Sequence, residues 1–154
     1  MISGATLEDV PQIVALSEMK RVEYEAYAPT FWRKAADSDE KQAPYTAVQL
    51  ERENAICLVS DADGSIDGFI VAHIVEAPPV YDPGSLVCMI DDFVVATPDL
   101  WNTVGQALLD EARRAVRVCG ADLAVVVCGH MDEPKRDMLK AAGLCVASEW
   151  WVSS

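Results

Sequence analysis

The chain has 154 residues, 51% of them apolar, and this length predicts a single domain over residues 1–154 with a sizeable buried core. Its formal net charge is −13, with 12 Lys and Arg against 25 Asp and Glu, so a nucleic acid is not an expected partner. No apolar run approaches the ~20 residues that a membrane span needs, and the N-terminus lacks the basic start and apolar stretch of a signal peptide, so we expect a cytoplasmic protein without a membrane partner.

The N-terminal part of the chain predicts one strand and two helices. A short strand is expected over Ile2–Ala5, and the apolar spacing that follows predicts a helix that stops before Pro29. Residues 33–44 are charged and end in a proline, so they are expected to form a loop. A second helix is expected over Tyr45–Asn54.

The rest of the chain predicts strands that alternate first with turns and then with helices. Residues 61–64, Asp-Ala-Asp-Gly, predict the turn of a hairpin. This order predicts an α/β fold, with a mixed and mostly antiparallel sheet flanked by helices. Trp150 and Trp151 are expected on opposite faces of the last strand, with one of them in the core. The expected elements are strands 55–60, 66–77 and 86–95, helix 103–119, strand 121–128, helix 132–142 and strand 144–152.

The stretch from residue 86 to residue 109 carries the main functional signal. An apolar strand bears two acids near its end, Asp91 and Asp92, and a short turn then leads into an amphipathic helix. A carboxylate in such a strand is costly to bury unless it is paired, hydrogen-bonded or used in chemistry. A strand-to-helix turn also directs free backbone N–H groups at an anion. The pattern therefore indicates a phosphorylated cofactor beside a candidate base.

The whole chain resembles the GCN5-related N-acetyltransferases, the GNAT superfamily. GATLEDVPQIVAL resembles the family's first strand and helix, DDFVVATPDLWNTVGQALLDEA its cofactor-binding strand, loop and helix, and KRDMLKAAGL its last helix with the glycine after it. The resemblance implies an acyl-coenzyme A-dependent N-acyltransferase that uses acetyl-CoA and acts on an amine of a small molecule or peptide. It also implies a homodimer.

The resemblance implies that the cofactor lies along the end of one strand and over the loop and helix that follow. Of the family's loop glycines this chain keeps only Gly105, and Trp101 and Thr103 are expected to bring side chains into the pyrophosphate space. Leu139 matches the position of the tyrosine that protonates the leaving thiolate, so that role is vacant. The cofactor-binding residues implied are Phe93, Val94, Val95, Trp101, Asn102, Thr103, Val104, Gly105 and Gln106.

The acidic pair is the expected source of the catalytic base. The family has a bulge in this strand that re-aims the side chains, so that Asp91 or Asp92 takes a proton from the amine, while backbone N–H groups stabilise the oxyanion. The alternative is that both aspartates bond to loop groups and only shape the bulge. The missing loop glycines and tyrosine leave a second function open, a non-catalytic binding or assembly module on the same fold.

Acceptor-binding residues are expected among the aromatic side chains of residues 24–32 and on the neighbouring strand. Tyr27, Phe31 and Trp32 are the candidates in the first group, and His73 is the candidate in the second. The structural alternatives are packing between two helices for the aromatic rings and a hydrogen-bonded core residue for the histidine.

Cysteines and basic residues give weaker signals. The five cysteines include no CxxC pair, so no metal site is expected, although Cys128 before Gly129 leaves a redox-sensing thiol as a third alternative. Six basic residues cluster late in the chain and form either solvated helix faces or a patch for an anionic cofactor. They are Arg113, Arg114, Arg117, Lys135, Arg136 and Lys140.

Overall fold

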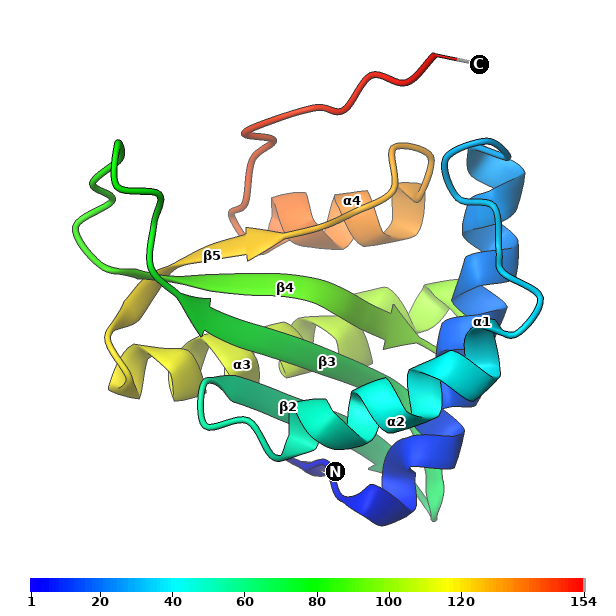
Figure 1. Cartoon of the computed structure of the whole chain (residues 1–154). Coiled ribbons are helices and arrows are strands. Elements are labelled where there is room, and N and C mark those ends of the chain that lie inside the picture. Colours follow the sequence, from blue (N-terminus) through cyan, green and yellow to red (C-terminus); the bar gives the residue numbers. More distant parts are fainter. Residues whose placement is uncertain (154) are drawn as a thin grey trace.

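The structure is a computed structural model that describes residues 1–153, and its centre is one five-stranded sheet in the order β1-β2-β3-β4-β5 (Figure 1). The first four strands pair antiparallel, and β5 pairs parallel to β4. This mixed, mostly antiparallel sheet confirms the predicted fold class. The strands are β1 (Ile2–Gly4), β2 (Ala55–Ala62), β3 (Ser65–Val75), β4 (Leu86–Val95) and β5 (Ala121–Val126).

Helices cover both faces of the sheet, with α1 and α2 on one face and α3 and α4 on the other (Figure 1). Two short 3-10 helices precede α1 and α3. Within residues 1–153, no helix combines the length and the apolar character that crossing a membrane requires. The helices are η1 (Leu7–Asp9), α1 (Val10–Tyr27), α2 (Ser38–Leu50), η2 (Pro98–Asn102), α3 (Val104–Val118) and α4 (Glu133–Ala141).

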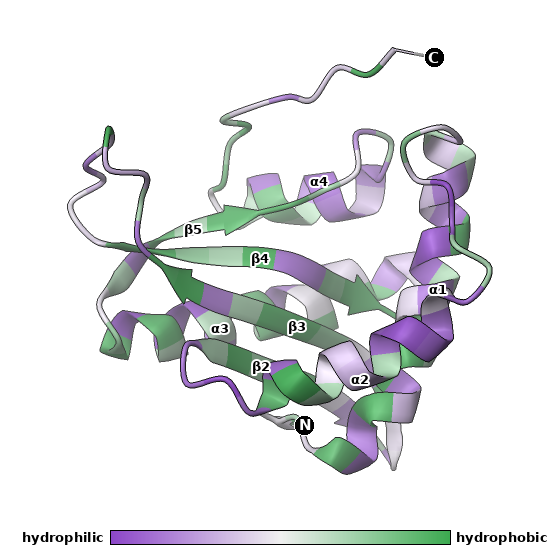
Figure 2. Ribbon diagram, in the orientation of Figure 1, coloured by the Kyte–Doolittle hydropathy of each residue, from purple (hydrophilic) through white to green (hydrophobic). Residues whose placement is uncertain are grey.

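The hydrophobic core lies on both sides of the sheet. One cluster packs the sheet against α3 and α4 and includes Trp101 and Leu108, and a smaller one packs it against α1 through Ile13 and Phe69. Figure 2 shows hydrophobic residues along the strands, interrupted by a hydrophilic stretch towards the end of β4. The acidic pair Asp91 and Asp92 lies in this part of β4.

The second helix begins earlier than the sequence predicted. Residues 33–44 were expected to be a loop, but α2 starts at Ser38 and contains Pro44 in its interior. A proline there removes one backbone hydrogen bond. Acidic residues in the first turn complement the positive end of the helix, and buried Gln42 and Gln49 fix it against the rest of the fold, which together offset that loss.

The predicted strand over residues 144–152 is absent from the described part of the chain. The segment is extended but has no partner strand, and Trp150 and Trp151 are 81% and 89% exposed, so neither enters the core. β5 is an edge strand of the sheet, but the segment does not pair with it. The segment instead runs beyond α4, away from the sheet, and its contact is between Trp150 and Phe31, with ring centres 5.9 Å apart (Figure 1).

A bulge lies in β4 at the acidic pair. Val71 of β3 pairs with Asp92, whereas the next residue, Ala72, pairs with Ile90, so Asp91 is the extra residue. The sequence resemblance implied this bulge, and the register confirms it. Its position matters because β4 and β5 separate at the same level.

Candidate functional site

The candidate site is the gap that opens where β4 and β5 part. Their last pair is Ile90 with Val126, and the Val127 N–H donates to the Ile90 carbonyl at 2.8 Å. Beyond this point β4 continues to Val95 without β5 beside it. A cavity of about 160 Å³ fills the gap, lined by α1, the end of β4, Val127 and α4.

The bulge brings both aspartates to this cavity. Asp91 and Asp92 line it together, although Asp91 has a side chain 55% exposed and Asp92 is partly buried. Burial, followed by the neighbouring Asp91 charge, raises the pKa of Asp92 above its ordinary value. A carboxylate with a raised pKa binds a proton more readily, so Asp92 suits the role of a base.

His73 lies beside the acidic pair rather than in the cavity lining. Its Nε2 lies 2.5 Å from Gln49 Oε1, and its Nδ1 lies 3.9 Å from Asp91 Oδ1. The ring is held between α2 and the bulge. This placement fits the structural alternative of a hydrogen-bonded histidine, with Gln49 as its partner.

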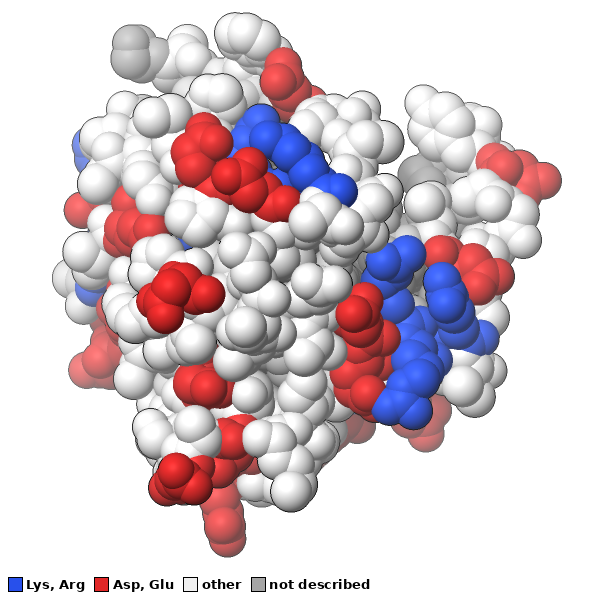
Figure 3. All heavy atoms as spheres, turned by 180° about the vertical axis from the view of Figure 1, so that it is seen from behind, with Lys and Arg blue, Asp and Glu red and all other residues white. Residues whose placement is uncertain are grey.

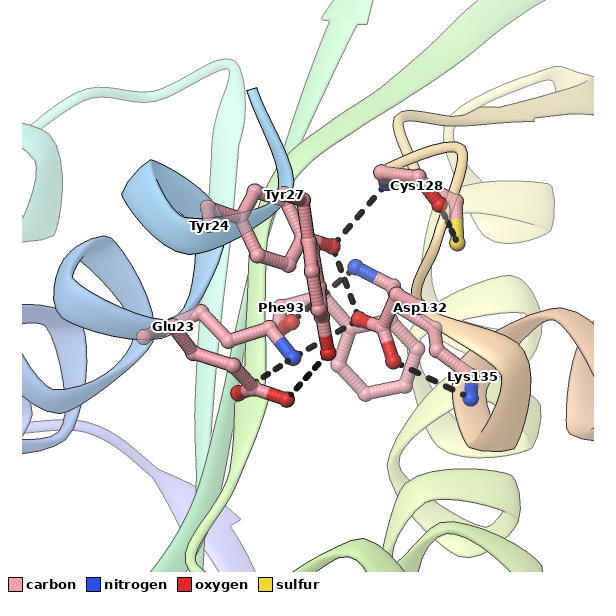
Figure 4. A network of polar contacts seen from close by, with 9 residues as sticks. Glu23, Tyr24, Tyr27, Phe93, Cys128, Asp132 and Lys135 are labelled. Carbon is pink, nitrogen blue, oxygen red and sulfur yellow. Dashed lines mark hydrogen bonds and ion pairs between the residues drawn. The ribbon is translucent and has the colours of Figure 1, made fainter. Parts of the chain in front are cut away.

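A buried polar network closes the gap on the side of α1 and α4 (Figure 4). The Asp132 side chain is 1% exposed, and its Oδ2 lies 2.7 Å from Lys20 Nζ and accepts a hydrogen bond from the Tyr24 hydroxyl at 2.8 Å. The Gly129 N–H donates to the same hydroxyl at 3.0 Å. Burial, followed by the Asp132 charge, raises the pKa of Tyr24, so its hydroxyl stays protonated.

The network also contains Lys135, which is 2% exposed and lines the cavity. Its Nζ donates to the Phe93 carbonyl at 3.1 Å and lies 5.1 Å and 5.3 Å from the ring centres of Phe93 and Trp101. Burial lowers the pKa of Lys135 to about 8. A lysine amine that titrates near neutrality therefore sits where β4 is open.

Sequence reasoning did not single out this network as functional. Lys20 and Tyr24 are four residues apart and therefore share one face of α1, which is a signal that the sequence contains. Asp132 is the N-cap of α4, and its Oδ1 accepts a weak hydrogen bond from the Lys135 backbone N–H at 3.4 Å. That these two elements meet across the open end of the sheet follows only from the tertiary structure.

The Trp101 indole does not project from the loop, contrary to the expectation. It is 2% exposed and packs edge-on against Phe93, with ring centres 4.9 Å apart. A Cβ at Gly105 would lie 2.6 Å from Trp101 Cε3, so the glycine is needed to admit the indole into the core. The indole is therefore a core residue that supports the loop from beneath.

The remaining loop residues form the start of α3. Asn102, Thr103 and Gln106 are exposed, and Val104 is half-buried. The first intrahelical bond runs from the Ala107 N–H to the Thr103 carbonyl at 3.0 Å, so the preceding N–H groups have no partner within the helix. Phe93, Val94 and Val95 lie on the open segment of β4, where Phe93 contacts the loop through Trp101.

The aromatic side chains expected to bind an acceptor divide into two groups. Trp32 lines the cavity, and its ring centre lies 5.3 Å from that of Tyr24. Tyr27 and Phe31 are outside the lining: the Tyr27 hydroxyl donates to Glu23 Oε1 at 2.7 Å, and Phe31 is 40% exposed beside Trp32. Burial and the bond to Glu23 raise the pKa of Tyr27.

The late basic residues do not form a common patch. Arg114 pairs with Glu111, Lys140 with Asp137 at 3.2 Å, and Lys135 is buried. Seen from behind, the basic side chains lie in separate groups bordered by acidic ones (Figure 3). This arrangement supports solvated helix faces over a site for an anionic cofactor.

Three of the five cysteines, Cys57, Cys88 and Cys128, are buried or half-buried, whereas Cys119 and Cys145 are exposed. Burial raises the pKa of Cys128, and raises the pKa of Cys57 and Cys88 to about 11, which disfavours the reactive thiolate. Within residues 1–153, no three His, Cys, Asp or Glu side chains gather in a group able to hold a metal ion.

Comparison with known proteins gives matches in structure only. No family model and no curated protein matches the sequence. A tetramutant of the BH1408 protein from Bacillus halodurans is 14% identical with a TM-score of 0.85, and the match covers 100% of this chain and 99% of that one. A predicted acetyltransferase from Clostridium acetobutylicum, solved with acetyl-CoA, is 13% identical with a TM-score of 0.77 and coverage of 100% and 95%.

A third similar structure is the ribosomal-protein-alanine N-acetyltransferase from Brucella melitensis, with 16% identity, a TM-score of 0.68 and coverage of 100% and 99%. At sequence identities this low, the matches show similarity of fold only. Together with the sheet order, the bulge and the parting of β4 from β5, they show that this chain has the fold of the GNAT acetyltransferases.

Proposed function

We propose that this protein is an N-acyltransferase that moves the acyl group of acetyl-CoA to an amine of a small molecule or peptide. The observation that carries the proposal is the cavity between β4 and β5, which places two carboxylates next to an open strand edge. An acyl transfer to an amine needs a base and donors for the oxyanion. In this proposal, a carboxylate of the acidic pair would serve as the base and backbone N–H groups of β4 would serve as the donors.

In this proposal the open edge of β4 holds the acyl donor. The Phe93 carbonyl points into the gap, since it accepts from Lys135. N–H and C=O groups of every second residue point to the same side of a strand, so the amides of Phe93 and Val95 share that side, with Val94 between them. Their N–H groups would bind the thioester oxygen, and the acetyl-CoA thioester would supply the activated acyl group.

The start of α3 is the proposed site for the pyrophosphate of the cofactor. The N–H groups of Val104, Gly105 and Gln106 lie in the first turn, where a helix favours an anion, whereas the Thr103 N–H donates to the Leu100 carbonyl, so Thr103 would contribute its exposed side chain. Asn102 would add a polar side chain, and Trp101 would support the turn from the core. The buried position of the indole removes the steric objection that the sequence raised.

Asp92 is the proposed base, and Asp91 at the bulge is its neighbour. Asp92 would take the proton that the amine loses when its nitrogen attacks the acyl carbon. Trp32 would provide an apolar wall for the acceptor, whereas His73 would act through Asp91. Tyr27 and Phe31 would line the approach to the cavity beside Trp32.

Two measurements test the proposal. Calorimetric titration with acetyl-CoA should give saturable heat, and an assay for released coenzyme A over a panel of amines should give turnover with at least one of them. The alternative function, a non-catalytic binding or assembly module, is favoured by the occupation of the Phe93 carbonyl by Lys135. That alternative gives no free coenzyme A with any amine.

We also propose a homodimer. Leu123 and Val125 on the open edge strand β5 are 44% and 38% exposed, and the extended segment after α4 exposes Trp150 and Trp151. Open edges and exposed apolar side chains favour association. Sedimentation equilibrium should give twice the monomer mass, and deletion of residues 144–154 should give the monomer. A monomeric full-length chain would contradict the assembly without affecting the proposed activity.

A further inference from the structure

Lys135 is a buried cation whose hydrogen-bonding capacity is only partly used. An ammonium group carries three donors, and within residues 1–153 its one hydrogen-bond acceptor is the Phe93 carbonyl at 3.1 Å. No carboxylate oxygen of the described residues lies within the 4.0 Å of an ion pair. Burying a charge without partners is costly, so the free donors in the cavity lining indicate a ligand that accepts from them.

The surroundings hold Lys135 in place without neutralising it. Asp132 fixes the first turn of α4, but its Oδ2 is taken by Lys20 and by the Tyr24 hydroxyl. The rings of Phe93 and Trp101 lie 5.1 Å and 5.3 Å from Nζ and attract the cation. The amine is therefore aimed at the gap between β4 and β5, with the carbonyl of Phe93 as its anchor (Figure 4).

We propose that Lys135 is the acid that protonates the thiolate of coenzyme A as it leaves. The inference rests on the proposed function and assigns a role that Leu139 leaves vacant. Lys135 lies four residues before Leu139 and thus on the same face of α4. Its Nζ is next to the strand segment that would bind the thioester.

The step balances as follows. The amine nitrogen attacks the acyl carbon, and its proton passes to Asp92. The C–S bond then breaks, and the sulfur receives a proton from Lys135 Nζ, leaving a neutral lysine and free coenzyme A. The cavity opens to solvent, from which Lys135 regains a proton and to which Asp92 returns one.

The protonation state of Lys135 suits this task. Its pKa of about 8 reflects burial first, and the nearby titratable groups modify it: Cys128 after β5, Asp132 at the N-cap of α4 and Asp92 on β4 raise the pKa, and Lys20 on α1 lowers it. The Tyr24 hydroxyl on α1 faces the same network and stays protonated. A thiol of the cysteine type titrates at about 8.5, so transfer from Lys135 is close to balanced. Lys135 must be protonated to act, so the rate should fall as pH rises through about 8.

The leaving group provides the first test. Lys135→Met keeps an unbranched side chain, one atom shorter, and removes the ammonium group, and Lys140→Met on the exposed face of the same helix is the control. We expect Lys135→Met to bind acetyl-CoA in calorimetry but to lose about 100-fold or more in transfer rate. With S-(4-nitrophenyl) thioacetate, whose thiolate leaves without a proton, the loss should shrink below about 10-fold. If Lys135→Met loses transfer rate equally with both acyl donors, or loses no rate with acetyl-CoA, the inference is overturned.

The pH profile provides the second test and remains available if the methionine variant does not fold. Lys135→Arg keeps the charge but does not release a proton at these pH values. With one acceptor for both proteins, the wild type should lose rate above about pH 8 and the arginine variant should be slow without that decline. If Lys135→Arg has the rate and the pH profile of the wild type, the inference about Lys135 is overturned but the proposed function is not. A wild type that releases no coenzyme A with any amine overturns the proposed function as well.

Discussion

At the scale of single residues, the bulge in β4 decides the chemistry of the acidic pair. Without it, Asp91 and Asp92 would point to opposite faces of the sheet, because side chains alternate along a strand. The extra residue brings both to one cavity, where they have different surroundings. Asp92 is the more buried of the two and has the raised pKa.

Replacement of Asp92 by Asn separates catalysis from stability. The variant should lose about 100-fold or more in transfer rate if Asp92 is the base. A raised pKa in the folded state means that folding disfavours the ionised form, so wild-type stability rises as pH falls through that pKa. Asp92→Asn should therefore unfold at higher urea concentration than the wild type at pH 7. Asp99→Asn in η2 is the exposed control, and a variant that is both active and less stable would contradict this assignment.

Gly105 shows how one residue admits another to the core. A methyl group there would lie 2.6 Å from Trp101 Cε3, so Gly105→Ala should lower the free energy of unfolding by about 1–3 kcal/mol, the usual cost of overpacking. Gly4→Ala, where nothing lies within 4 Å, is the matched control. Urea denaturation measures both, and equal stability of the two variants would mean that the indole moves without cost.

At the scale of elements, polar contacts of Glu18 join α1 to the start of α2 and to the segment before it. Glu18 on α1 binds Lys34 at 2.8 Å in the connecting segment and also accepts from Ser38 at the start of α2. These contacts explain why α2 begins where it does, despite Pro44. They connect the first residue of α2 to α1 through polar side chains, which the pattern of apolar spacing does not reveal.

The pKa of Glu18 makes this junction sensitive to acid. Bonds from Lys34 and Ser38 lower it from the ordinary 4.5 to about 2. A lowered pKa in the folded state stabilises the fold above 4.5, and this contribution is lost as pH falls towards 2. The wild type should therefore be more stable than Glu18→Gln at pH 6, and the difference should vanish near pH 2. Glu8→Gln is the exposed control, and a difference independent of pH would contradict the ion pairs.

At the scale of the whole molecule, charge is the dominant global property. A net charge of −13 on 154 residues means that the folded chain repels itself. Three of the described ion pairs are local and largely exposed, and such pairs contribute little. The long-range repulsion should therefore outweigh them.

Salt should accordingly stabilise the fold. The screening length falls from about 30 Å at 10 mM to about 8 Å at 150 mM salt, so self-repulsion weakens over that range. We expect Tm to rise by about 2–4 °C for each kcal/mol gained, measured by thermal denaturation at fixed pH. Sucrose, which stabilises without screening, is the control for general solvent effects, and a fall in Tm with salt would show that ion pairs dominate.

Sequence patterns by themselves determined the order of most elements, the fold class and the acidic pair, because these depend on local periodicity and on the turn and cap residues between the elements. Two local predictions were wrong for reasons outside their own segments. Pro44 is tolerated inside a helix held by α1, and the segment after Leu144 runs beyond α4 without pairing with the edge strand β5.

Tertiary structure alone decided what surrounds the acidic pair. The burial of Trp101 depends on Gly105 and Phe93, and the network of Tyr24, Asp132 and Lys135 joins residues more than a hundred positions apart. The sequence shows each side chain but not the parting of β4 and β5 that brings them together. A buried cation and carboxylate acquire their properties from the groups that exclude water around them, and those groups come from distant parts of the chain.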